Sequence, residues 1–136
     1  MSKKIIVLLL IFTFMLVGCD KIKEKIKQTV DDPPIKESIP LFEFDKYKDF
    51  IIDNVTSLSI IRYTEGGADE EKITAQDKIQ NTYNMLSKIN IANETTKACE
   101  DNTTVYRFTM KDGTTTVIEI ECDWLVVGNK RYEIEK

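Results

Sequence analysis

The 136-residue chain contains no histidine. This absence removes the commonest general base, the Ser-His and Cys-His catalytic pairs and the commonest zinc ligand. Glycine is scarce too, with five residues, and the adjacent Gly66 and Gly67 form no phosphate-binding loop. No serine lies in a Gly-x-Ser-x-Gly nucleophile elbow. We therefore expect a protein that is not an enzyme and that has neither a cofactor nor a metal site.

The sequence also lacks an apolar run long enough to cross a membrane. Its longest, from Ile5 to Val17, has 13 residues, whereas a helix spanning the hydrocarbon core needs about 20. The run follows the basic start Met1-Ser2-Lys3-Lys4, and a small glycine with a lone cysteine, Gly18-Cys19, comes directly after it. This order of basic, apolar and small residues is typical of a secretory signal.

The segment Leu16-Val17-Gly18-Cys19 resembles the lipobox of bacterial lipoproteins. The resemblance implies that residues 1–18 are a signal peptide, that Leu16, Val17 and Gly18 are recognised by its peptidase, and that the Cys19 sulfur carries a diacylglycerol. Two acyl chains anchor a protein stably, whereas one is marginal. We expect a lipid-anchored protein on the extracytoplasmic face of the cell membrane. The alternatives are an ordinary cleaved signal and an uncleaved signal anchor.

Residues 19–40 indicate a lipidated tether and linker. Alternating lysines surround Ile22, Ile26 and Val30, a spacing that suits either a short helix on anionic head groups or a solvated spacer. Asp31-Asp32-Pro33-Pro34 ends any helix there. The folded domain is therefore predicted to comprise residues 41–136.

The first half of this domain predicts two helices and two strands. A short helix runs from Asp45 to about Asn54, and a strand follows over Val55 to Thr64. Residues 65–71 are predicted to be a surface loop. The main helix spans Thr74 to Ile89, because its apolar residues recur at helical spacing. An edge strand is expected over Thr95 to Cys99.

The C-terminal third alternates apolar and polar residues as a meander does. A three-residue loop, Lys111-Asp112-Gly113, sets Phe108 opposite Thr116 and Tyr106 opposite Ile118. A two-residue turn would instead mix the two faces. The hydrophobic register therefore selects the three-residue loop.

A second hairpin is predicted at Gly128-Asn129, with Leu125 opposite Tyr132. Together these elements predict an α+β fold, an antiparallel sheet of about four to five strands with one main helix packed on one face and a short N-terminal helix. The strands "KDGTTTVIEI" and "WLVVGNKRYEI" resemble those of small uncharacterised lipoproteins common in low-GC Gram-positive bacteria. That resemblance implies no activity.

Cys99 and Cys122 remain once Cys19 is acylated, and two cysteines in an exported domain predict a disulfide. The alternative is a free Cys122 buried on an apolar face. The acidic run Asp69-Glu70-Glu71 is either a charged loop or, less in keeping with its spacing, a calcium ligand set.

Trp124, Val126 and Arg131 are predicted to face away from the core and to form a binding patch, since Trp and Arg are favoured at interfaces. Alternatively, the main helix covers Trp124. The formal charge of −4 argues against nucleic acid as a partner. We expect a noncatalytic binding module for a protein or envelope component. The alternatives are an immunity or inhibitor lipoprotein against a toxin or hydrolase, and a carboxylate-based enzyme or metal carrier.

Overall fold

The computed structural model describes residues 37–100 and 102–135, which belong to the compact unit Lys36–Lys136. Eight strands of this part form one sheet in the order β1-β4-β8-β7-β6-β5-β2-β3, with every neighbouring pair antiparallel. The strands are β1 (Ile39–Pro40), β2 (Val55–Thr64), β3 (Gly67–Ile73), β4 (Asn90–Thr95), β5 (Thr103–Met110), β6 (Thr115–Glu121), β7 (Trp124–Val127) and β8 (Lys130–Glu135).

The α+β prediction is wrong. The described residues hold one α-helix, α2 (Gln76–Leu86), and two short 3-10 segments, η1 (Leu41–Glu43) and η2 (Ile52–Asn54), beside a sheet of eight strands rather than four or five. The difference arises because segments expected as a loop or a linker also pair with the sheet. The molecule is mostly β-structure.

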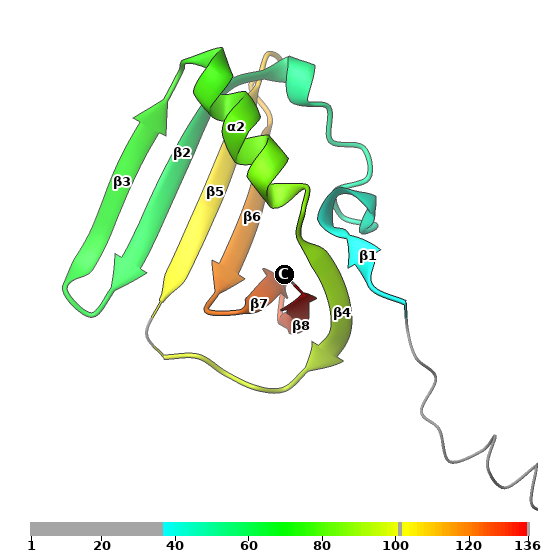
Figure 1. Ribbon diagram of the computed structural model, residues 1–136. Coiled ribbons are helices and arrows are strands. Elements are labelled where there is room, and N and C mark those ends of the chain that lie inside the picture. Colours follow the sequence, from blue (N-terminus) through cyan, green and yellow to red (C-terminus); the bar gives the residue numbers. More distant parts are fainter. Residues whose placement is uncertain (1–36, 101, 136) are drawn as a thin grey trace, which may run out of the picture. The chain divides into compact units, whose positions relative to one another are not determined.

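The sheet has two unlike faces. One, which we call the helix face, carries the fully buried Leu58, Phe108, Ile118 and Leu125. The residues alternating with them point to the opposite side, which we call the outer face. Figure 1 shows α2 lying across β2, β5 and β6, while β7 and β8 turn out of the plane of these strands.

The core lies between the helix face and a cover made by α2 and the segment from Leu41 to Asn54. From α2, Ile79 and Leu86 are buried in it, as the predicted apolar stripe requires. From the covering segment, Leu41 and Tyr47 are buried. The buried core residues that the structure describes lie within 41–125, so the compact unit Lys36–Lys136 has a hydrophobic core of its own, as an independently folding domain does.

The predicted short helix over Asp45 to Asn54 is wrong. This segment forms hydrogen-bonded turns and ends in η2. Its neighbouring apolar side chains point in different directions: the Phe50 ring centroid lies 5.0 Å from that of Phe108, whereas Ile51 is 56% exposed. A helix this short is marginal in water, so packing of individual aromatic rings decides the backbone path.

The predicted loop over residues 65–71 is also wrong. It contains most of β3, which pairs with β2 in a hairpin from Thr64–Gly67 to Leu58–Ile73. Gly67 adopts φ 128° at the turn, a conformation that glycine reaches without steric cost. The acidic run lies on this edge strand, where charge discourages pairing with another chain. Arg62 of β2 lies within 3.8 Å of Asp69 and 3.6 Å of Glu71.

The main helix and the preceding strand agree more closely with the sequence. β2 has the predicted bounds, and α2 occupies the middle of the predicted span Thr74 to Ile89. Ala75 is the N-cap residue of α2, and its side chain makes no cap hydrogen bond. Gln76 instead donates to the Val55 carbonyl oxygen (3.2 Å).

The meander registers are confirmed. Tyr106 pairs with Ile118 and Phe108 with Thr116, and the second hairpin sets Leu125 opposite Tyr132. The edge strand expected over Thr95 to Cys99 is wrong. The chain forms β4 earlier, over Asn90–Thr95, and this strand is internal, between β1 and β8.

Leu16, Val17, Gly18 and Cys19, with most of the predicted tether, lie outside the described residues. Within the described ranges, no helix has the length and apolar character needed to cross a membrane.

Candidate functional site

On the outer face of the sheet, a row of side chains crosses adjacent strands and is apolar except for Glu119 and Arg131. Ile61 of β2 pairs with Val105 of β5, and both side chains are nearly buried, at 7% and 8% exposure. The row continues through Glu119 of β6 and Val126 of β7 to Arg131 of β8. No helix in the described part of the chain packs on this face (Figure 1), where neighbouring side chains shield the row.

Trp124 and Val126 both lie on this outer face of β7, because Leu125 between them is fully buried on the helix face. The helix therefore does not cover Trp124. Both side chains are half-buried, and Val126 is the register partner of Arg131. The structure thus brings together the three predicted patch residues on one surface.

Arg131, at the β8 end of this surface, is held in place by a carboxylate. Its Nε donates to Glu121 Oε2 at 2.7 Å, with the side chains 32% and 16% exposed. The hydrogen bond to Glu121 and the negative charge of that carboxylate raise the pKa of the Arg131 guanidinium above its usual value. A fixed guanidinium loses less conformational freedom when a partner binds than a free one does.

Four members of this surface were not predicted as site residues: Ile61, Val105, Glu119 and Glu121. Val105 precedes Tyr106 in β5 and therefore lies on the opposite face of the sheet. Its apolar side chain is the one feature in the sequence that could have indicated a site there. Glu121 precedes the Cys122-Asp123 turn, and nothing in the sequence ties it to Arg131, because the strands that carry them, β6 and β8, are not neighbours.

Cys99 and Cys122 form a disulfide, with their Cα atoms 6.2 Å apart. Cys122 occupies the two-residue turn between β6 and β7 and adopts φ 51°, a region that residues other than glycine rarely use. Its backbone N–H donates to the Asn102 carbonyl oxygen (2.8 Å). The bond therefore ties the loop after β4 to this turn.

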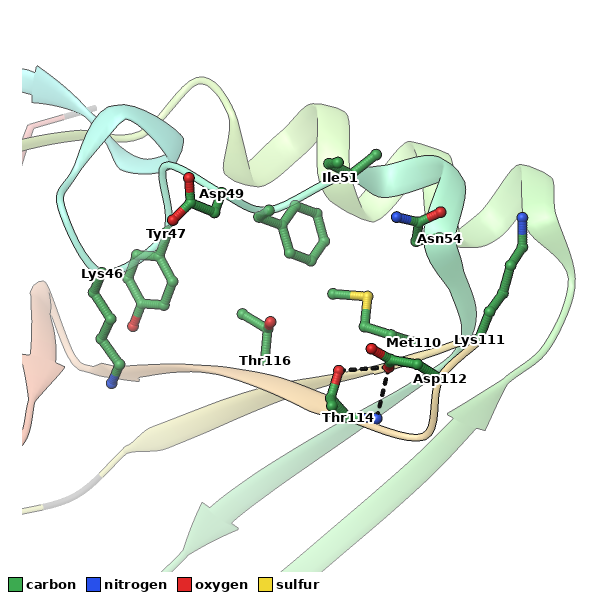
Figure 2. A pocket seen from close by; sticks show the side chains of 11 residues that line it. Lys46, Tyr47, Asp49, Ile51, Asn54, Met110, Lys111, Asp112, Thr114 and Thr116 are labelled. Atoms are coloured by element: carbon green, nitrogen blue, oxygen red, sulfur yellow. Dashed lines mark hydrogen bonds between the residues drawn. The ribbon is translucent and has the colours of Figure 1, made fainter.

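A polar pocket of about 410 Å³ lies beside the turn between β5 and β6 (Figure 2). Its rim includes Lys46 and Asp49 on one side and Lys111 and Asp112 on the other. Asp112 Oδ1 accepts hydrogen bonds from the Thr114 backbone (2.9 Å) and hydroxyl (2.6 Å), which lower the pKa of its carboxyl. The paired charges balance, so the pocket favours neither an anion nor a cation.

Tyr47 lines this pocket, and its hydroxyl group reaches the backbone of β6. Among the described residues, β7 pairs with Glu119 to Glu121 and stops short of Val117, which pairs with Arg107 of β5 on its other side. The Tyr47 hydroxyl donates to the Val117 carbonyl oxygen (3.2 Å). Burial, with the nearby charge of Glu119, raises the pKa of Tyr47 to about 12.

The acidic side chains do not assemble a metal centre within the described residues, where no group of three potential ligands is found. Asp69 and Glu71 instead lie beside Arg62. The structure therefore gives the calcium alternative no geometric support.

Comparisons with protein-family models, with curated proteins and with solved structures find no match to this chain.

Proposed function

We propose that this protein is a membrane-tethered, noncatalytic binding module whose outer sheet face docks a protein partner in the cell envelope. The observation that carries the proposal is the group of Trp124, Val126 and Arg131 on the outer face, where no described helix packs and where Glu121 holds the Arg131 guanidinium. An apolar centre with one fixed guanidinium is the composition typical of binding hot spots.

The shape of the surface favours a macromolecule over a small metabolite. Small ligands bind in concave cavities that enclose most of their surface, whereas a sheet face offers a broad area. Charged side chains border the apolar row, as in the polar rim of an interface. On the Glu133 side, for example, Lys97 Nζ lies 3.7 Å from the carboxylate.

The charge of the domain narrows the class of partner. From Leu41 onward the chain has 12 basic and 18 acidic residues, a formal charge of −6. Complementary charge speeds encounter and disfavours wrong partners. A partner with a basic surface, such as a basic toxin or hydrolase that the module neutralises, fits this charge.

The location rests on the segment Leu16-Val17-Gly18-Cys19, which resembles a lipobox. Its test is the intact mass of the protein extracted from membranes of its native host, compared with Cys19→Ala. We expect a chain that starts at residue 19 with added diacylglycerol, and loss of that species in the variant. An unlipidated mass for the natural chain would contradict the tether.

A further inference from the structure

The helix face is not covered along its whole length. α2 ends at Leu86, and the strands β5 and β6 continue beyond it (Figure 1). There a cavity of about 440 Å³ opens between the end of the helix and the sheet. Its volume lies within the range of small-molecule sites, about 300–1,000 Å³.

The walls of this cavity, which we call the end pocket, are mostly apolar. Met85, Leu86 and Ile89 line one side, and Ile120 and Ile134 line the other. Met85 stands 49% exposed at the helix end, although its side chain is apolar. Flexible methionine side chains adapt to ligands of varied shape, so an exposed one beside an apolar cavity suits a binding site.

In the described part of the chain, the lining has few polar groups, and its one charged side chain is positive. Lys88 is the one charged side chain among the described residues that line the end pocket, and none of these lining residues is acidic. This is notable in a domain with more acidic than basic residues. Thr104 and Tyr106 add hydroxyl groups. Arg62, the register partner of Thr104, lies beside Asp69 and Glu71, so Lys88 is the positive charge available to a ligand among the described lining residues.

We propose that the end pocket binds a single-chain amphiphile with an anionic head group, for which a medium-chain fatty acid is the simplest model. The hydrocarbon chain packs on the isoleucine and methionine side chains, and the carboxylate pairs with Lys88. This site lies on the opposite face of the sheet from the proposed docking surface, and the inference does not depend on the membrane tether.

Binding of decanoate to residues 36–136, with the disulfide formed, tests the proposal. Isothermal titration below the micelle concentration is expected to show saturable 1:1 binding. Lys88→Gln should weaken it about tenfold, the effect of losing one charge-assisted hydrogen bond. Met85→Glu, which adds a like charge at an exposed lining position, should weaken it at least as much. Lys78→Gln, on the exposed side of α2 away from the lining, is the matched control and should bind as the natural chain does.

A second titration distinguishes recognition of the head group from nonspecific hydrophobic binding of the chain. Decyltrimethylammonium has a similar chain and the opposite charge, so we expect it to bind far more weakly than decanoate. Equal binding of the two amphiphiles, or no saturable binding by a folded domain, would overturn the proposal. So would an affinity that Lys88→Gln and Met85→Glu leave unchanged while the melting temperature shows that both variants are folded.

Discussion

The two faces of the sheet are made from the same strands, yet they meet different surroundings. On β5, Phe108 is fully buried on the helix face beneath Phe50, whereas Val105 on the outer face is shielded only by its neighbours. On β7, Leu125 is fully buried and Trp124 is half-buried. Alternation along a strand thus separates the residues that stabilise the fold from those available to a partner.

Side chains of this sheet are therefore shielded from water in two different ways. On the helix face the shielding results from a second layer, which removes side chains from water and stabilises the fold. On the outer face no element of the described residues supplies that layer (Figure 1). An apolar surface without a cover is the feature expected of a docking site.

The sharpest test of this comparison replaces one residue on each face of β5. Phe108→Ala should lower the free energy of unfolding by about 3–5 kcal/mol, because a fully buried aromatic ring leaves a cavity. Val105→Ala should cost only about 1.5 kcal/mol, since two methyl groups are lost from a less protected site. Urea denaturation measures both values. Equal losses would show that the two faces are packed alike.

The disulfide adds a covalent constraint at the open end of the helix face. Its separation of 23 residues predicts a stabilisation of about 3 kcal/mol on the chain-entropy model. A reducing agent should therefore lower the denaturation midpoint of the natural chain and leave Cys99→Ala/Cys122→Ala unaffected. If both proteins respond to the reducing agent equally, the bond does not stabilise the domain.

Tyr47 tests how the covering segment is held to the helix face. Tyr47→Phe keeps the ring and removes the hydrogen bond to Val117, which should cost about 1 kcal/mol. The raised pKa of Tyr47, about 12, predicts a pH effect as well. The neutral hydroxyl is favoured in the folded state, so its contribution is complete below about pH 10 and is lost as the pH rises toward 12.

An absorbance titration at the tyrosinate band checks this assignment. One tyrosine of the natural chain should ionise late, near pH 12, and Tyr47→Phe should remove that late step. Tyr106, whose pKa burial also raises, remains as an internal reference in both proteins. If Tyr47→Phe leaves the number of tyrosines that ionise near pH 12 unchanged, the protected hydroxyl lies elsewhere.

The smallest effect on stability is expected at the proposed docking surface. Trp124→Ala should lower the free energy of unfolding by about 1 kcal/mol or less, although it removes the largest side chain, because surface positions contribute little. Calorimetric melting against the natural chain gives the value. A loss as large as that of Phe108→Ala would mean that Trp124 belongs to the core.

Much of the second half of the domain is predictable from the sequence, because short hairpins combine local turn signals with strict alternation. The Lys111-Asp112-Gly113 loop fixes the register of β5 with β6, and the Gly128-Asn129 turn fixes that of β7 with β8. The predicted patch follows from the same alternation, since Trp124 and Val126 lie beside the buried Leu125.

The first half is less predictable, because distant contacts decide it. The polar β3 has no apolar alternation, and it becomes a strand only by pairing with β2. Tyr47 leaves the expected helical stripe to reach Val117, which lies 70 residues further along the chain. The Arg131 and Glu121 pair and the end pocket likewise depend on which strands lie side by side, and local sequence carries no signal for this.

Site-specific photocrosslinking in the native host tests the docking surface most directly. A benzophenone side chain at position 126 lies on the outer face, and one at position 80 lies on the exposed side of α2 as a matched control. If the outer face docks a protein, we expect one discrete protein adduct from position 126, lost in Trp124→Ala and absent from position 80. No adduct at position 126, or the same adducts from both positions, would contradict it.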